Sequence, residues 1–171
     1  RSGWKIANRQ IEGSETDYGT NYIICLENSS NNTVTGNTCS KSYYGIYLYN
    51  ANNNTVTGNT CNNALGGIHL ESSSDNRVIG NTCNDTSSGI FLYDSSDNTV
   101  IGNTCNQANS GIYLENSSDN TVTGNTCYGT YMGIHLYASS NNNTVTGNTC
   151  NNNDYGIYLY NANNSTVTGN T

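Results

Sequence analysis

The strongest constraint on this chain is one short phrase that returns at a fixed interval. The stretch NTVTGNTC stands at Asn54–Cys61 and recurs, intact or nearly so, seven times. A second phrase, GI-x-L, begins at Gly45, Gly67, Gly89, Gly111, Gly133 and Gly156, with a spacing of 22 residues that becomes 23 once. A fixed period of this size indicates stacked repeats, in which each unit packs against its own neighbours.

Within one unit the pattern has period two, which is typical of β-strands. Ile46 and Leu48 alternate with two tyrosines, and Val56 stands between two threonines. No helical period and no Asn-Gly or Asp-Gly hairpin signal occurs. Short strands without hairpins must pair with their copies one repeat away. The sequence therefore predicts an all-β fold, a single parallel β-helix of about seven 22-residue rungs with three short strands per rung.

The first repeats are weaker than the rest. Residues 1–22 are predicted to form a degenerate N-terminal rung and a longer loop, because Ile11 and Ile24 are six residues further apart than the period requires. Asn8 is assigned to the position of the asparagine after glycine. Residues 23–171 are predicted to be regular repeats of the same domain, with an open C-terminal end after TGNT.

Two other structural classes, a leucine-rich repeat and a disordered chain, fit the sequence less well. A leucine-rich repeat needs about five to seven aliphatic positions per unit, and this unit has four, Ile46, Leu48, Val56 and Cys61. Disorder would suit the 33% hydrophobic content, but the polar residues are mainly Asn, Thr and Ser, which can bond in stacked rows. Only five Lys and Arg are present against a net charge of −7, which excludes nucleic acid and anionic membranes as main partners. The sequence contains no run of 18 apolar residues, which is the length that would predict a membrane-spanning helix.

The phrases NNTVTGNTCNN and GIYLY resemble the right-handed parallel β-helix repeats of the carbohydrate-binding and sugar-hydrolase (CASH-type) superfamily. More closely, they resemble the NosD-like repeats of periplasmic and archaeal cell-surface proteins. The resemblance covers about Lys5 to Thr171 and rests on structural positions. It implies a right-handed coil, an extracellular, cell-surface or periplasmic location, and a copper-delivery setting.

Two repeated positions are predicted to form internal ladders, with strands ~4.8 Å apart. The cysteine ladder is Cys39, Cys61, Cys83, Cys105, Cys127 and Cys150. The asparagine ladder is Asn37, Asn59, Asn81, Asn103, Asn125, Asn148 and Asn170. The cysteines have three interpretations: buried thiols that pack as small hydrophobes, disulfides between rungs, or a soft-metal chain such as Cu(I). Cys25 falls on an outward site and is expected to be the reactive thiol.

The outward sites of the GIYLY strand form a predicted aromatic stripe edged with carboxylates. The first site reads Cys25, Tyr47, His69, Phe91, Tyr113, His135 and Tyr158. The second reads Glu27, Tyr49, Glu71, Tyr93, Glu115, Tyr137 and Tyr160. Such a stripe favours a binding or assembly surface, for a glycan or for a second copy of the chain. The alternative is structural, because aromatic residues are common in strands.

Enzymatic function is not expected. His69 and Glu71 share one face and could form an acid–base pair, but glycosidases need two carboxylates at a fixed gap, and no such constellation is evident. A polysaccharide-active enzyme therefore stays an alternative, and both histidines are assigned to the aromatic row.

Two further rows suggest other ligands. Threonine pairs such as Thr121 and Thr123 resemble the Thr-x-Thr arrays of ice-binding solenoids. Asp75, Asp97 and Asp119 recur one rung apart at a turn and are the only candidate Ca²⁺ ligands; solvated turn charges are the alternative. No cofactor is expected, with calcium and copper as alternatives. The expected partner is the chain itself, a longer parent chain or a glycan.

Overall fold

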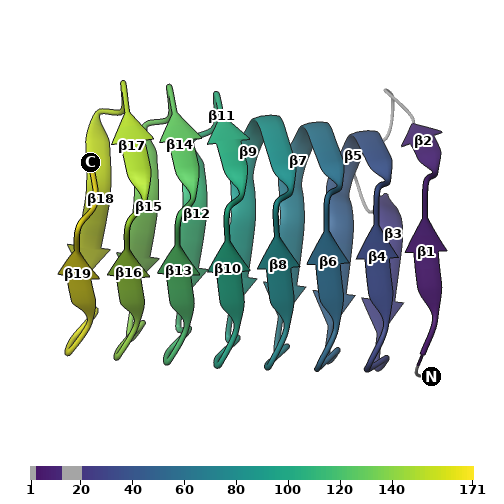
Figure 1. The fold of residues 1–171 in the computed structure, drawn as a ribbon, viewed down its shortest axis with the longest axis horizontal. Helices are drawn as coiled ribbons and strands as arrows, with labels where there is room; N and C mark the ends of the chain where they lie inside the picture. Colours follow the sequence, from purple (N-terminus) through teal and green to yellow (C-terminus); the bar gives the residue numbers. More distant parts are fainter. Residues whose placement is uncertain (1–2, 13–20) are drawn as a thin grey trace.

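The computed structural model describes residues 3–12 and 21–171, and within these ranges the chain is all-β, with 19 strands and no helix (Figure 1). One sheet contains β1 (Lys5–Ala7), β4 (Thr33–Thr35), β6 (Thr55–Thr57), β8 (Arg77–Ile79), β10 (Thr99–Ile101), β13 (Thr121–Thr123), β16 (Thr144–Thr146) and β19 (Thr166–Thr168). The other contains β2 (Gln10–Glu12), β3 (Tyr22–Glu27), β5 (Thr38–Tyr49), β7 (Thr60–Glu71), β9 (Thr82–Tyr93), β11 (Thr104–Asn106), β12 (Ser110–Glu115), β14 (Thr126–Tyr128), β15 (Met132–Tyr137), β17 (Thr149–Asn151) and β18 (Tyr155–Tyr160).

All strand pairs are parallel, and each repeat lies in register on the next. Val34 pairs with Val56, which pairs with Val78, and Cys61 pairs with Cys83. The result is a coil of about seven turns, as the 22-residue period predicts, seen in Figure 1 as a row of arrows from the N-terminus to the C-terminus. The predicted longer loop falls almost wholly on residues 13–20, which lie outside the described ranges.

The predicted three strands per rung hold in the later rungs, where β10, β11 and β12 are separate. In the earlier rungs the cysteine strand and the GI-x-L strand are continuous, giving 12-residue strands β5, β7 and β9. Single left-handed residues, such as Asn63 (φ 51°) and Asp85 (φ 53°), turn the corner there. The residues beyond them still pair, as Ala64 does with Thr86, so the strand bends without ending.

The core is one continuous stack of inward side chains. Ile68, Leu70, Val78 and Cys83 are fully buried, and their copies repeat along the coil. Polar columns complete the interior: the predicted asparagine ladder, a second asparagine ladder, and a serine column that includes Ser95. The second ladder is Asn32, Asn54, Asn76, Asn98, Asn120 and Asn143.

Asn residues in the predicted ladder bond from rung to rung. Asn59 donates from its backbone N and its Nδ2 to Oδ1 of Asn81, at 2.9 and 3.0 Å. The assignment of Asn8 to this ladder is wrong. Asn8 takes the left-handed glycine position (φ 53°), and the backbone N of Arg9 donates to Oδ1 of Asn37. Strand register explains the shift, because Ala7 pairs with Thr35 and places Asn8 opposite Gly36.

Candidate functional site

The sheet that carries the GI-x-L strands presents most of the tyrosines on its outer surface, here called the aromatic face. Three outward columns run along it, each named after one member. The Gly66 column reads Tyr22, Tyr44, Gly66, Ser88, Ser110, Met132 and Tyr155. The Phe91 column reads Cys25, Tyr47, His69, Phe91, Tyr113, His135 and Tyr158, and the Tyr93 column reads Glu27, Tyr49, Glu71, Tyr93, Glu115, Tyr137 and Tyr160.

The Phe91 column is a continuous ring stack. Phe91 lies 4.6 Å from His69 and 4.7 Å from Tyr113, and Tyr113 lies 4.6 Å from His135, with interplanar angles of 24°, 6° and 11°. Phe91 and Tyr113 therefore use both faces on their neighbours and turn an edge outward, while His69 and His135 are buried at the two ends of this stack. Stacking of this kind stabilises the sheet surface and leaves little ring face for a sugar in the middle of the row.

Carboxylates of the Tyr93 column bond to hydroxyls of the Phe91 column. The Tyr47 hydroxyl donates to Oε2 of Glu71 at 2.6 Å, and the Tyr113 hydroxyl donates to Oε2 of Glu115 at 2.8 Å. Partial burial, together with the hydrogen bond to the carboxylate, raises the pKa of Tyr47 and of Tyr113. These tyrosines stay neutral and hold the two carboxylates against the face.

His69 lies in the aromatic row, as predicted, and does not form the alternative acid–base pair with Glu71. His69 is 4% exposed, neither ring nitrogen has a hydrogen-bond partner, and burial lowers the pKa of His69 to about 4. The Tyr44 ring covers it edge-on at 4.4 Å. A neutral, enclosed imidazole cannot exchange protons with a bound substrate, so His69 is a member of the ring stack.

A hollow opens in the Gly66 column, where small residues stand between large ones. A pocket of about 190 Å³ is lined by Tyr44, Leu65, Gly66, Ser87, Ser88 and Phe91. A second pocket of about 320 Å³ is lined by Asn63, Ala64, Leu65, Asp85 and Ser87. The sequence carries a signal for this hollow, because the two residues before each GI change from Tyr-Tyr to Leu-Gly and Ser-Ser. The prediction of a regular aromatic stripe did not include these positions.

The cysteines are free, and the predicted inward column is real. Cys39 to Cys127 of the ladder are fully buried, Cys150 is half-buried and Cys25 is exposed. Hydrogen bonds to Cys105 and Cys61, together with burial, raise the pKa of Cys83 well above its ordinary value. Partial burial and the nearby Glu27 also raise the pKa of Cys25, so this accessible thiol is held in its protonated form.

The glycine of GI-x-L is explained by the cysteine one rung on. A Cβ at Gly89 would lie 2.7 Å from Sγ of Cys105 and 2.6 Å from the Gly111 carbonyl oxygen. The two repeated phrases are therefore one packing unit, because the sulfur fills the space that a side chain at the glycine would need.

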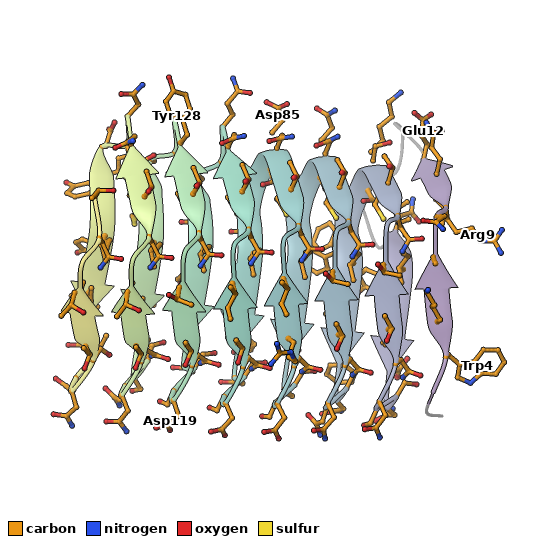
Figure 2. All side chains as sticks on the ribbon, in the orientation of Figure 1. Trp4, Arg9, Glu12, Asp85, Asp119 and Tyr128 are labelled. Carbon is orange, nitrogen blue, oxygen red and sulfur yellow. The ribbon has the colours of Figure 1, made fainter. Side chains whose placement is uncertain are left out.

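Two further rows, of aspartates and of threonines, are the other ligand sites that the sequence suggests. Asp75, Asp97 and Asp119 adopt left-handed backbone angles (φ 57–59°), a conformation that Asp tolerates, and Figure 2 shows Asp119 at the lower corner of the coil. Within residues 3–12 and 21–171, no three His, Cys, Asp or Glu side chains come together to hold a metal. Since β8 and β10 place Arg77, Ile79 and Ile101 outward, the longest unbroken Thr-x-Thr array covers only β13, β16 and β19.

The sequence of this coil matches a known protein family. Residues 2–154 match the family model described as "Periplasmic copper-binding protein (NosD)". The chain belongs to the NosD family. Sulfur donors suit Cu(I), but this NosD-family chain encloses five of its ladder sulfurs completely, and its described residues gather no three-ligand cluster. The residues present therefore do not fit a resident copper site. No curated protein sequence matches the chain.

Solved structures with the same fold include two epimerases and a lyase. A double mutant of the periplasmic alginate epimerase AlgG has a TM-score of 0.74 at 16% identity, over 99% of this chain and 51% of the epimerase. Alginate lyase from Paenibacillus sp. str. FPU-7 has a TM-score of 0.62 at 16% identity, over 100% and 93%. The Azotobacter vinelandii mannuronan C-5 epimerase AlgE6 A-module has a TM-score of 0.58 at 16% identity, over 99% and 54%.

These neighbours are right-handed β-helix proteins, and at such low identity they show the fold alone. The NosD-family chain spans about half the length of the epimerases that it matches. Its described residues contain no helix long and apolar enough to cross a membrane.

Proposed function

We propose that this chain is a non-catalytic β-helix module that binds polysaccharide through its aromatic face, in the periplasm or at the cell surface. The observation that carries the proposal is the gathering of most of the 14 tyrosines on one of the two sheets. Tyrosine joins an apolar ring to a hydroxyl, which suits the mixed surface of a sugar. Tyr131, Tyr137, Tyr155 and Tyr160 are 36–48% exposed, so one part of the face offers accessible rings.

The absence of a catalytic role is supported by how the titratable side chains are used. Glu71 and Glu115 each accept a tyrosine hydroxyl, and His69 is enclosed. Hydrolysis of a glycosidic bond needs a proton donor and a second carboxylate on opposite sides of one bond. The aromatic face offers separate, hydrogen-bonded carboxylates, which suit contacts with sugar hydroxyls. The location follows the family description and the periplasmic AlgG neighbour.

Affinity electrophoresis of the chain in gels that contain single neutral or acidic polysaccharides tests the proposal. We expect retardation by at least one polysaccharide. A double variant Tyr137→Ala/Tyr160→Ala, which removes two rings stacked at 5.3 Å, is expected to weaken that binding at least about tenfold. The matched control Thr146→Ala/Thr168→Ala changes the same rungs on the opposite sheet and is expected to bind as the native chain does.

Two results would count against polysaccharide binding. If no polysaccharide retards the native chain, the proposal fails. If the tyrosine variant instead changes only the sedimentation coefficient without added glycan, the aromatic face serves self-association between copies of the chain, the alternative that the sequence also predicted.

A further inference from the structure

The hollow in the aromatic face exists because three consecutive rungs lack a large side chain, at Gly66, Ser88 and Ser110. In the Gly66 column, Gly66 and Ser88 follow Tyr22 and Tyr44. A Cβ at Gly66 would lie 2.5 Å from Cδ1 of Tyr44, so the Tyr44 ring leans over this glycine. The roughly 190 Å³ pocket on rungs β7 and β9 begins beside that ring.

Tyr44 stacks on Tyr22 at 5.8 Å and 6°, and Tyr47 and His69 lie beside it at 5.4 and 4.4 Å. The side of the ring away from Tyr22 lies over Gly66 and lines the pocket. Phe91, on the adjacent wall, is stacked on both faces and contributes an edge. Tyr44 is therefore the stacking platform of the pocket, and Phe91 limits its width.

Polar groups stand opposite the platform. Ser87 and Ser88 supply hydroxyls in the first pocket, and Asn63 and Asp85 supply an amide and a carboxylate in the second. The two pockets share Leu65 and Ser87, so a chain-like ligand can pass from one to the other. One apolar wall with hydroxyls and acceptors around it complements a sugar ring, which has an apolar face and a rim of hydroxyls. The first pocket is smaller than the ~300–1,000 Å³ of drug-sized sites, as a single ring requires.

The charges around the hollow select against an acidic sugar. Asp85 lines the second pocket, and Glu71 lies beside the first on the same face. No Lys or Arg among the described residues lines either pocket; by strand register, Lys41 stands one rung from Asn63. A uronate carboxylate would lose water here and would meet like charge from Asp85 in the pocket wall. Alginate, named in the neighbouring structures, is built from such acidic units.

We propose that the pocket on rungs β7 and β9 takes one ring of a neutral glycan, stacked on Tyr44, while the next unit enters the second pocket beside Asn63 and Asp85. This inference rests on the proposed function and adds the sugar class and the subsite to it. It separates this chain from fold relatives that act on a polyuronate.

Isothermal titration of the full chain with cellohexaose, mannohexaose and hexamannuronate tests the subsite. At least one neutral hexasaccharide is expected to bind ten or more times tighter than hexamannuronate. Ser88→Trp fills the pocket and is expected to weaken that binding at least tenfold. Thr99→Trp places the same indole on the opposite sheet, on strand β10, and is expected to bind as the native chain does. Ser87→Trp, at an exposed corner, replaces Ser88→Trp if that variant does not fold.

The outcomes separate the two proposals. If Ser88→Trp, or Ser87→Trp in its place, binds the neutral hexasaccharide as tightly as the native chain does, the subsite is overturned and polysaccharide binding by the aromatic face stays intact. Equal or tighter binding of hexamannuronate overturns the neutral-sugar assignment. Retardation by a polysaccharide without binding of either neutral hexasaccharide overturns the subsite alone, and binding of no saccharide in any assay overturns both.

Discussion

Two columns, one on each sheet, run along this coil and differ in how far their residues vary. Inside, Val34, Val56, Val78, Val100, Val122 and Val145 repeat without change over six rungs. Outside, the Gly66 column runs from tyrosine through glycine and serine to methionine and back to tyrosine. Each inner side chain must fit the same cross-section, so any change there leaves a void or a clash. The outer column has no such constraint, and its variation is where recognition can be encoded.

The largest expected difference in stability is between removing a buried side-chain amide, at Asn103, and removing a half-exposed one, at Asn106. Asn103 accepts from the backbone N and Nδ2 of Asn81 and donates to the Val78 carbonyl. Asn103→Ala leaves these buried groups unpaired and is expected to lower the free energy of unfolding by about 4 kcal/mol. Asn106, three residues away and half-exposed, bonds only outward to Asn84 at 3.0 Å, and Asn106→Ala is expected to cost less than about 1 kcal/mol.

Urea unfolding of the two variants measures the difference. If Asn103→Ala and Asn106→Ala lower the free energy of unfolding equally, the inner asparagine ladder contributes no more to stability than the outer amides do.

The next largest difference in stability is expected between alanine substitutions at two glycines, one packed and one in open space. Gly89→Ala places a Cβ against Cys105 and Gly111 and is expected to destabilise the fold by about 3 kcal/mol through overpacking. Gly102 has a φ of 62° with open space around it, so Gly102→Ala should cost only the left-handed conformation, about 1 kcal/mol. Thermal unfolding of both variants checks the order, and a larger loss at Gly102 would contradict the packing argument.

The smallest of the three effects concerns pH. Burial lowers the pKa of His69 to about 4, below the ~6.5 of an unfolded chain. Between these values the unfolded state binds the proton first, so stability falls as the pH falls from about 6.5 toward 4. We expect His69 to account for about 2 kcal/mol of lost stability at pH 4.5 relative to pH 7.

His69→Phe continues the stack with Phe91 and is expected to remove that part of the pH dependence. His135→Phe is the matched variant and should remove less, because Glu115 opposes the lowering of the His135 pKa by burial. Unfolding midpoints at pH 7 and pH 4.5 test both, and an unchanged pH slope in His69→Phe would rule out His69 as its source.

Periodicity sufficed to predict the coil, because the inward valine, cysteine, isoleucine, leucine and asparagine positions each recur with the same residue type. It predicted the column of Cys83 and its copies and the ladder of Asn81, since a residue repeated at 22 must stack on itself. It did not reveal that Tyr44 leans over Gly66, because these residues share a column that has no repeated residue type and the direction of a ring depends on its χ angles. Nor did alternation show that Phe91 presents an edge, since ring orientation depends on χ angles that no pattern of letters encodes.

The asparagine ladders also have a direction. Asn54, Asn76 and Asn98 each donate to the next rung toward the C-terminus, and the ladder of Asn59 does the same. The side-chain carbonyl oxygens therefore all point to the N-terminal end, while each Nδ2 donates both to the next asparagine, as Asn59 does to Asn81, and to a backbone carbonyl of the preceding rung, as Asn59 does to Val34. The partial charge of these oxygens at the N-terminal end is opposite in sign to that of an α-helix. Two of the few basic residues, Lys5 and Arg9, lie at the oxygen end, where Figure 2 shows Arg9, so the coil is electrically polar along its axis.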